Sequence, residues 1–308
     1  MLDPNFLITV DVEDWFQVEN FKNHIPFSSW SSCELRVERN VHRLLDLFDS
    51  VKLDSHSRPR KSSAVNPSHP GGAPSPKATF FVLGWIAGRI PHLVREIDAR
   101  GHEIASHGYK HELCNDQSPG NLTTDLVESK KLLEDVIGRQ VYGYRAPSFS
   151  INDQTLKIIE QSGYRYDSSY NSFAMHERYG RVDMTRYEKK GISIKISNAF
   201  HELPISNLKF GVGSLPWGGG GYFRLMPFWL FRRGVQTILN KAKAYLFYVH
   251  PWEIDPGQPR LDEAARVYRF RHYVNLKGTY SKLSKFFLYF DRCRFITCHQ
   301  YLNQVRDF

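Results

Sequence analysis

The sequence contains few cysteines and no cysteine pair of the kind that binds structural zinc. Its 308 residues include four cysteines, Cys33, Cys114, Cys293 and Cys298, and no CxxC motif joins any two of them. This number is too small for a disulfide framework, and the spacing is wrong for a structural zinc site. We therefore expect reduced thiols, as in a cytoplasmic protein.

Long apolar runs are also absent. No stretch approaches 18 consecutive apolar residues, so we expect no transmembrane helix. The first residues, MLDPNFLITVDVEDW, are acidic and lack the positive region and the small-residue cleavage site of a signal peptide. This pattern predicts a cytoplasmic protein, for which the inner face of the membrane stays open as a site of peripheral association.

Runs of positive charge are missing although the chain is basic. Lys and Arg number 41 against 32 Asp and Glu, which gives a formal net charge of +9, but no Lys/Arg run exceeds three residues. A basic balance favours acidic partners such as nucleic acid, anionic lipid or an anionic polymer. No basic–aromatic nucleic-acid motif occurs, so we expect no nucleic-acid partner. Scattered, solvated side chains would explain the same charge without any partner.

Apolar patterns that alternate between strand and helix fill most of the chain. Hydrophobic residues make up 41% of it and charged residues 24%, which allows a sizeable core and excludes disorder of the whole. Strands are predicted at 5–12, at the start of 78–87 and of 102–112, and at 141–150, 164–169 and 244–253, whereas 183–224 has a β-like, loop-rich pattern. Helices are predicted at 38–50, 92–101, 121–138, 153–163, 225–242, 278–291 and 298–307. This alternation favours an α/β fold with a largely parallel sheet and helices outside it.

One segment departs from this pattern. Residues 54–77 are rich in Ser, Pro and Gly and have almost nothing to bury, which predicts an exposed, flexible insertion. We find no internal repeat and no domain boundary. The insertion interrupts one unit, so we expect a single domain over 1–308 with a C-terminal extension over about 255–308.

Polar side chains recur where the predicted strands end. They are Asp11, Glu13 and Asp14 after the first strand, His107 and His111 after the third, and Arg145, Asp167 and His250 after later strands. In a parallel α/β barrel the side chains at the carboxyl ends of the strands converge on one face. We therefore expect these residues to approach one another.

His107 and His111 are four residues apart, a spacing at which two imidazoles can share a divalent metal ion. The pair alone is a weak signal, because 13 histidines make chance pairs common. Two histidines and one carboxylate leave a coordination position open for water or substrate, which is the catalytic pattern for zinc.

Five ordered motifs resemble those of the polysaccharide deacetylase family, which is carbohydrate esterase family 4 with its NodB-homology domain. The matching segments are TVDVEDW at 9–15, SHGYKH at 106–111, RAPS at 145–148, YDSS at 166–169 and FYVHP at 247–251. The stretch ATFFVLG is also similar to a segment of this domain. The resemblance covers nearly the whole chain except about 54–77.

Four further segments resemble the subgroup found in exosortase-associated exopolysaccharide loci. They are DVEDWFQVENF at 11–21, GGGGYFRLMP at 218–227, HPWEIDPGQPR at 250–260 and RFRHYVNL at 269–276. The resemblance implies a distorted (β/α) barrel of the deacetylase type with about seven parallel strands. It also implies a hydrolase that removes N-acetyl groups from N-acetylhexosamine units of a bacterial polysaccharide, in exopolysaccharide biosynthesis or on a peptidoglycan-like polymer.

The resemblance implies roles for four catalytic residues. Asp11 would be the general base and His250 the general acid that protonates the departing amine, a role that suits an imidazole with a pKa near neutrality. Arg145 would pair with Asp11, and Asp167 would hydrogen-bond His250 and raise its pKa.

The resemblance also implies a divalent metal, most naturally Zn²⁺, held by His107 and His111. The third ligand stays open between two carboxylates, since the chain has D-V-E-D where the common pattern has adjacent aspartates. Along a strand Glu13 faces the same way as Asp11, whereas a turn after Val12 would favour Asp14. A metal-free amidase or cyclic-imide hydrolase of the same fold therefore remains an alternative.

Trp15, Tyr222 and Trp252 lie beside the motifs and, with Pro147 of the third motif, are the candidate substrate-binding residues. Aromatic faces stack on sugar rings, although in a chain so rich in aromatics such a residue belongs more often to the core.

A non-catalytic carbohydrate-binding protein of polymer assembly is the third hypothesis. The presence of a base and an acid together argues against it. The expected partners are the polysaccharide substrate and, peripherally, the membrane or the exopolysaccharide machinery.

Overall fold

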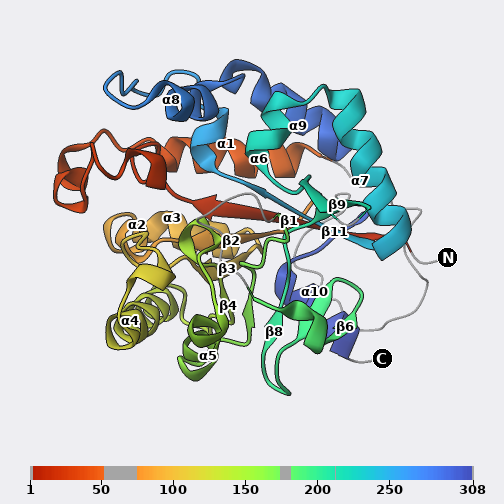
Figure 1. Ribbon diagram of the computed structural model, residues 1–308. Helices are drawn as coiled ribbons and strands as arrows, with labels where there is room; N and C mark the ends of the chain where they lie inside the picture. Colours follow the sequence, from red (N-terminus) through yellow and green to blue (C-terminus); the bar gives the residue numbers. More distant parts are fainter. Residues whose placement is uncertain (1–2, 52–74, 174–181, 212, 307–308) are drawn as a thin grey trace.

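Figure 1 shows the computed structural model of the chain, which describes residues 3–51, 75–173, 182–211 and 213–306. The predicted insertion at 54–77 lies outside the described residues except for its last three positions. Among the helices of the described ranges, none has the length and apolar character needed to cross a bilayer.

Twelve strands occur in the described residues. They are β1 (Asn5–Val12), β2 (Ala78–Val82), β3 (Glu103–Ser106), β4 (Gly143–Tyr144), β5 (Tyr166–Asp167), β6 (Glu188–Lys190), β7 (Ser193–Lys195), β8 (His201–Glu202), β9 (Asn207–Phe210), β10 (Gly213–Pro216), β11 (Ala244–Val249) and β12 (Arg294–Phe295). The helices are α1 (Val37–Ser50), α2 (Gly84–Arg89), α3 (Pro91–Ala99), α4 (Pro119–Ile137), α5 (Asp153–Gln161), α6 (Gly220–Leu225), α7 (Phe228–Ala242), α8 (Arg266–Tyr273), α9 (Leu276–Tyr289) and α10 (Cys298–Arg306).

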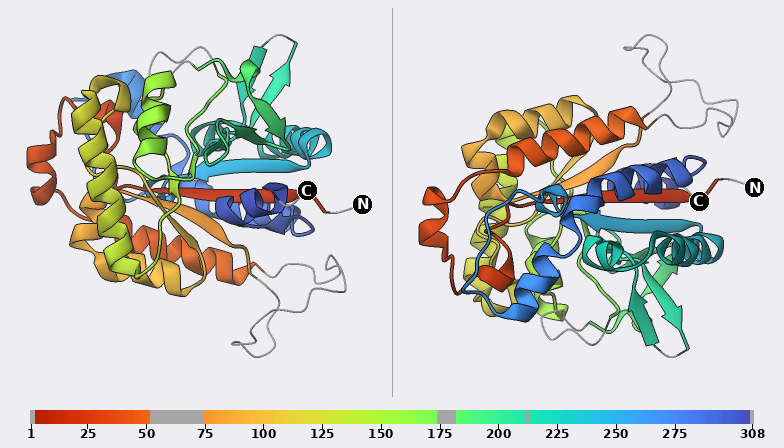
Figure 2. Two further views of the ribbon diagram at one scale, coloured as in Figure 1. Left: turned by 90° about the horizontal axis from the view of Figure 1, so that it is seen from below. Right: turned by 90° about the horizontal axis from the view of Figure 1, so that it is seen from above.

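The large sheet has the strand order β11-β1-β2-β3-β4-β5-β8-β7-β6, and β12 pairs with β1 beside this path. The seven strands from β11 to β8 are parallel, while β7 and β6 continue the sheet in antiparallel pairing. β9 and β10 form a separate antiparallel pair, which stands apart from the large sheet in Figure 2. The expected α/β fold with about seven parallel strands is confirmed, and its sheet is a half-barrel.

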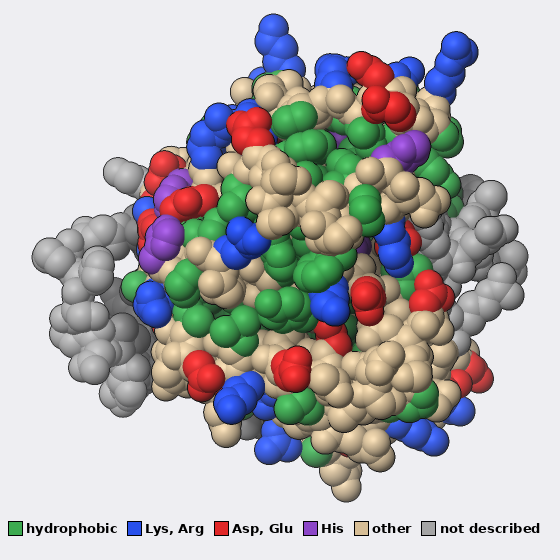
Figure 3. All heavy atoms as spheres, turned by 90° about the vertical axis from the view of Figure 1, so that its left-hand side faces the viewer, with side chains coloured by type: hydrophobic (Ala, Val, Ile, Leu, Met, Phe, Trp, Pro, Cys, Tyr) green, Lys and Arg blue, Asp and Glu red, His purple; other side chains and the backbone are tan. Residues whose placement is uncertain are grey.

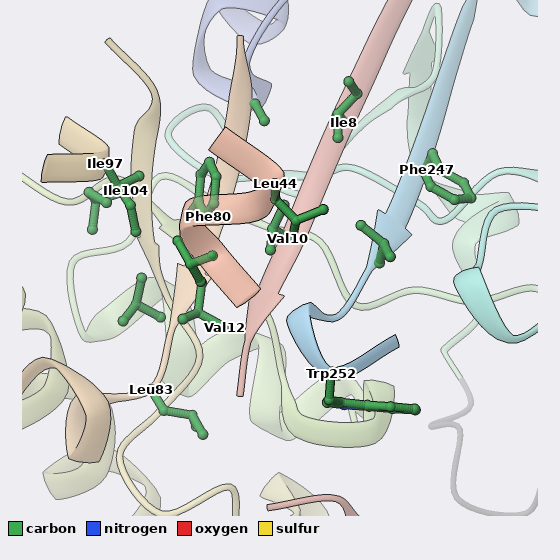
Figure 4. Close-up of a cluster of buried hydrophobic side chains, with 14 of the residues drawn as sticks. Ile8, Val10, Val12, Leu44, Phe80, Leu83, Ile97, Ile104, Phe247 and Trp252 are labelled. Carbon is green, nitrogen blue, oxygen red and sulfur yellow. The ribbon is translucent and has the colours of Figure 1, made fainter. Parts of the chain in front are cut away.

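Strand β1 lies at the centre of two apolar layers. Phe6, Ile8, Val10 and Val12 point into the larger cluster, whereas Leu7 belongs to a second cluster that includes side chains of α10. Figure 4 shows Ile8, Val10 and Val12 among side chains from α1, α3, β2 and β11. Because side chains alternate along a strand, Thr9 and Asp11 share the face of Leu7. The general base candidate is thereby on the inner face of the half-barrel.

The structure differs from the predicted elements in three places. The strand expected over 141–150 is only β4, because the chain leaves the sheet at Arg145 and turns through a 3-10 helix at Pro147–Phe149. The helix expected over 225–242 begins only at Phe228, as α7, because Pro227 lacks the amide hydrogen that a helix interior requires. Helix α6 lies before it, almost wholly in the segment 183–224 that was expected to be β-like. Helix α8 lay in a segment without a predicted element.

Adding a methyl group at two helical glycines should have opposite effects on the free energy of unfolding. A Cβ at Gly234 of α7 would lie 2.2 Å from the indole ring of Trp217, whereas a Cβ at Gly278 of α9 would meet no atom within 4 Å. Gly234→Ala should lower the free energy of unfolding by about 1–3 kcal/mol through overpacking. Gly278→Ala should raise it by about 0.5–1 kcal/mol, because alanine has the higher helix propensity. Urea unfolding of both variants measures this difference, and equal shifts would contradict the packing described for α7.

Candidate active site

A cavity of about 490 Å³ lies where the parallel strands end. Asp11, Glu13, His107, His111 and His250 line it; Asp11 lies near the end of β1, and the others follow β1, β3 and β11. Figure 3 views the molecule from the side on which α2, α4 and α8 lie in Figure 1, and hydrophobic side chains form a hollowed band across this face. Five of the polar residues predicted at strand ends therefore meet at one cavity.

Arg145 and Asp11 form a buried ion pair. Arg145 Nη1 donates to Asp11 Oδ1 at 2.6 Å and to Thr9 Oγ1 at 2.8 Å, and the guanidinium is fully buried. Its Nε and Nη2 donate to the carbonyl and hydroxyl oxygens of Ser168, each at 2.9 Å. Burial alone would raise the pKa of Asp11, but Arg145, followed by the nearby histidines, outweighs burial and holds this pKa below its usual value. The predicted contact between Arg145 and Asp11 is confirmed.

Glu13, His107 and His111 form a group with the composition of a metal site. One ligand atom from each lies within 4.8 Å of the other two, and all three side chains are buried. His111 Nε2 is 3.5 Å from Glu13 Oε2. His107 Nδ1 donates to the carbonyl oxygen of Arg145 at 2.7 Å, which fixes the ring and leaves Nε2 free to bind a metal.

The electrostatics of this group also fit a divalent cation. Burial lowers the pKa of both His107 and His111 to about 4, so both rings are neutral near pH 7 and offer a lone pair. Glu13 Oε2 is buried and lacks a hydrogen-bond partner among the described residues. A buried carboxylate oxygen without a donor is costly in a protein interior, and a cation would satisfy it.

Asp14, the other candidate for the third ligand, has a different environment. Its Oδ2 accepts hydrogen bonds from the amides of Arg36 at 2.6 Å and Val37 at 2.8 Å, and its Oδ1 accepts from the amide of Trp15 at 2.8 Å. Asp14 thus caps the start of α1 and is not among the residues that line the cavity. Of the two carboxylates left open by the sequence, the geometry favours Glu13.

His250 is held by a carboxylate that the sequence interpretation did not assign to it. His250 Nδ1 donates to Glu253 Oε1 at 2.7 Å, and its Nε2 is 3.0 Å from Glu13 Oε1. Glu253 Oε2 in turn accepts from Arg224 Nε at 2.8 Å, and both residues are buried. Burial would lower the pKa of His250, but the charges and hydrogen bonds of Glu13 and Glu253 raise it to about 10.

The hydrogen bond expected between Asp167 and His250 is wrong. Asp167 accepts from the hydroxyl of Ser169 at 2.7 Å and pairs with buried Glu202, while both ring nitrogens of His250 contact other carboxylates. Burial raises the pKa of Asp167 and, together with the charge of Asp167, that of Glu202. A side chain on a strand only two residues long can be assigned to a partner only once the neighbouring strand, here β8, is known.

The four candidate substrate-binding residues are divided between the cavity and the core. Tyr222 and Trp252 line the cavity, and the Trp252 ring stacks on His250 with centroids 5.2 Å apart. Trp15 packs against Phe16 and donates from Nε1 to the carbonyl oxygen of Glu34. Pro147 is buried and does not line the cavity. The expectation that such aromatics belong largely to the core therefore describes Trp15 correctly.

Backbone strain marks the rim of the cavity. His111, Ser148 and Phe149 have φ angles of 55°, 51° and 59°, which residues other than glycine seldom adopt. All three line the cavity. Strained residues of this kind concentrate at functional sites, where the surrounding structure enforces them.

Sequence interpretation missed Glu253, Arg224 and the α8 residues Val267, Phe270 and Arg271, which also line or support the cavity. A signal for Glu253 was present, because the i,i+3 spacing in HPWE allows its side chain to reach back to His250. No comparable local pattern linked Arg224 or α8 to the site.

Two family models match adjoining parts of the chain. The model described as polysaccharide deacetylase matches residues 75–166, which include His107, His111 and Arg145. A domain of unknown function (DUF3473) matches residues 168–303, which include His250, Glu253, Arg224 and α8. The deacetylase match ends within β5, and the cavity is formed by residues from both matched parts and from the segment 11–20 before them.

Curated relatives include deacetylases of bacteria. The peptidoglycan-N-acetylglucosamine deacetylase of Bacillus cereus is 33% identical over 89 residues, which are 29% of this chain and 41% of that protein. The peptidoglycan deacetylase of Helicobacter pylori is 26% identical over 199 residues, which are 64% of this chain and 63% of that protein. The chain thus spans less than two thirds of the length of these curated relatives.

Solved structures show the same fold at low sequence identity. A Mycobacterium smegmatis structure described as a polysaccharide deacetylase superposes with a TM-score of 0.60 at 19% identity, over 98% of this chain and 90% of that one. The Puue allantoinase superposes with a TM-score of 0.56 at 13% identity, over 96% of this chain and 88% of that one. One fold thus accommodates proteins with two different names, and the function has to be argued from the site.

The geometry predicts that Glu13 and Asp14 respond differently to removal of charge. Glu13→Gln should weaken Zn²⁺ binding by more than about tenfold, because it removes a charged ligand from the group with His107 and His111. Asp14→Asn keeps one acceptor oxygen for the α1 cap and should affect Zn²⁺ affinity far less. Isothermal titration of the metal-stripped proteins measures both, with far-UV circular dichroism as the control for folding. A greater loss in Asp14→Asn would contradict the assignment.

Proposed function

We propose that the protein is a metal-dependent hydrolase that removes N-acetyl groups from N-acetylhexosamine units of a bacterial polysaccharide. The observation that carries this proposal is the meeting of three groups at one cavity. They are the Asp11–Arg145 pair, the His250–Glu253 pair and the cluster of Glu13, His107 and His111. The family match of residues 75–166 and the deacetylase relatives support the same activity.

Asp11 is the proposed general base. Arg145 keeps its carboxylate ionised near pH 7, and Oδ1 is engaged at 2.6 Å, so Oδ2 is the atom available to accept a proton from the attacking water. Attack on the acetyl carbonyl forms a carbon–oxygen bond, and the carbon–nitrogen bond then breaks to release acetate.

His250 is the proposed general acid. Its raised pKa keeps the ring protonated near pH 7, and Glu253 fixes its orientation through Nδ1, so that Nε2 carries the proton toward the cavity. Nε2 lies 3.9 Å from Asp11 Oδ2, so the proposed base and acid reach the same part of the cavity. Protonation of the departing amine completes the hydrolysis.

Glu13, His107 and His111 are the proposed ligands of a divalent ion, for which Zn²⁺ is the natural choice of this donor set. When bound, such an ion polarises the acetyl carbonyl and makes the attacking water more acidic. The hydrogen bond from His107 to the Arg145 carbonyl oxygen would fix the position of this metal ligand relative to the Asp11–Arg145 pair.

The proposed polymer is a bacterial exopolysaccharide. This part of the proposal rests on the resemblance of 11–21, 218–227, 250–260 and 269–276 to the exosortase-associated subgroup. Three of these segments fall in the part matched by DUF3473, and each supplies residues that line or support the cavity. Peptidoglycan, the substrate class in the names of the relatives, is the reference polymer for comparison.

Loss of the base should abolish the reaction. Asp11→Asn should lower kcat for acetate release from N-acetylglucosamine oligomers by about 10²- to 10⁴-fold, because the amide cannot accept the proton. A coupled acetate assay measures this rate.

A chelator arm of the same assay separates the proposal from its alternatives. EDTA should abolish activity and added Zn²⁺ should restore it. Full activity in EDTA would favour the metal-free amidase, and sugar binding without acetate release would favour the non-catalytic hypothesis.

Kinetics of two variants can distinguish Glu253 from Asp167 as the residue that positions His250. Glu253→Gln should lower kcat by roughly 10²- to 10⁴-fold with little change in KM, because a carboxylate that orients an imidazole acts on the proton-transfer step. Steady-state kinetics of Glu253→Gln and Asp167→Asn on one substrate compare the two. A greater loss of kcat in Asp167→Asn would contradict the assignment of Glu253.

A further inference from the structure

A second cavity of about 430 Å³ adjoins the active-site cavity. We name it the α8 groove; it is lined by Arg260, Asp262, Arg266, Arg269, Phe270, Tyr273 and Val274. Phe270 lines both cavities, so a long ligand can pass from one to the other over its ring. In Figure 1, α8 lies at the upper left, and Lys and Arg side chains stand along the upper edge of the face in Figure 3.

The charge of the α8 groove is positive. Asp262 is the carboxylate in its lining, and Arg269 Nη1 pairs with it at 3.0 Å. The Arg260 guanidinium lies over the Tyr273 ring at 5.0 Å, and within the described part of the chain no carboxylate pairs with it. Arg266 in the groove and Arg271 in the active-site cavity have no ion pair or hydrogen-bonded side chain among the described residues. Three arginines are therefore available to an anion along this path.

The apolar part of the same surface is exposed. Phe270 is 59% exposed and Val267 is 58% exposed, although both are large hydrophobic side chains. An exposed aromatic face beside a cavity that contains a base and an acid is suited to stack on a sugar ring of the substrate. Arginine side chains on either side would then meet anionic substituents of the neighbouring sugars.

Helix α8 is fixed to the active site by buried contacts. Arg224, which holds Glu253, also donates to the carbonyl oxygens of Arg271, His272 and Val274 at the end of α8. The His272 ring stacks on Trp252 with centroids 4.1 Å apart. The α8 groove therefore keeps a set distance from His250, as a subsite for the next sugars of a polymer requires.

We propose that the α8 groove binds an anionic stretch of the polysaccharide substrate, in which sugars next to the reacting N-acetylhexosamine carry carboxylate or phosphate groups. This inference rests on the proposed deacetylase function and narrows its substrate class. It also assigns part of the net charge of +9 to the binding of an anionic substrate.

The test compares three oligosaccharides of equal length. One is a neutral N-acetylglucosamine oligomer, one alternates N-acetylglucosamine with glucuronate, and one carries phosphodiester links. The wild-type protein should have a higher kcat/KM for at least one acidic oligomer, through a lower KM. The double variant Arg260→Gln/Arg266→Gln should reduce the acidic-to-neutral ratio of kcat/KM by about 3- to 30-fold, as expected for two exposed charge contacts. Added salt should reduce the ratio as well.

Arg95→Gln is the matched control, because Arg95 is an exposed arginine of α3, away from the α8 groove. The carboxylate and phosphate oligomers show which anion the groove prefers.

An equal kcat/KM for neutral and acidic oligomers, unaltered in the double variant, would overturn the inference while leaving the deacetylase function intact. Failure to release acetate from any oligomer would instead refute the proposed function. Loss of binding to vesicles of anionic lipid in the double variant, without a change in the oligosaccharide ratio, would assign the arginines to a membrane surface and also overturn the inference.

Discussion

The buried ion pair between Arg145 and Asp11 is the constraint on which the arrangement of the site depends. A guanidinium without solvent contact is stable only if nearly all its donors find acceptors, because removing a charge from water costs several kcal/mol. Arg145 finds them on β1, in Thr9 and Asp11, and in Ser168 directly after β5. The ends of β1, β4 and β5 must therefore meet at one point. The carboxylate that results is ionised, oriented and on the inner face of the half-barrel.

A second buried pair, Arg224 with Glu253, performs the corresponding task for His250. It lies entirely in the part of the chain matched by DUF3473, and it links the imidazole to the backbone of α8. A Cβ at Gly220 would lie 2.3 Å from the Glu253 carboxylate, which explains why the first turn of α6 contains glycine here. His250, Glu253 and the α8 part of the cavity lining thus form one packed unit, while the residues of the proposed metal site follow β1 and β3.

Much of the fold and of the site could be predicted from local pattern. The long helices α1 and α4 have apolar residues at helical spacing, and the buried strands β1 and β11 are nearly continuous apolar runs, so their existence followed directly from the sequence. Strands β4 and β5 are two residues long, and a pattern of that length has no period. The partner of Asp167 was therefore wrong, since the prediction depended on how short strands meet their neighbours. The choice between Glu13 and Asp14 needed the position of the α1 N-terminus, which captures Asp14.

The sequence by itself determined the α/β class and the order of the strand-end motifs, because parallel strands direct the residues at their carboxyl ends to one edge. The contact of Arg145 with Asp11 was expected from the family resemblance of these motifs. Only the tertiary structure decided which carboxylate serves which histidine. Glu253, Asp167 and Asp14 are all acidic residues near a motif, and their chemistry is nearly identical in isolation. Their differences arise from long-range contacts with Arg224, Glu202 and the amides of α1, which bury each carboxylate beside a different partner. The same is true of α8, whose position beside the cavity is set by Arg224 and Trp252 from distant parts of the chain.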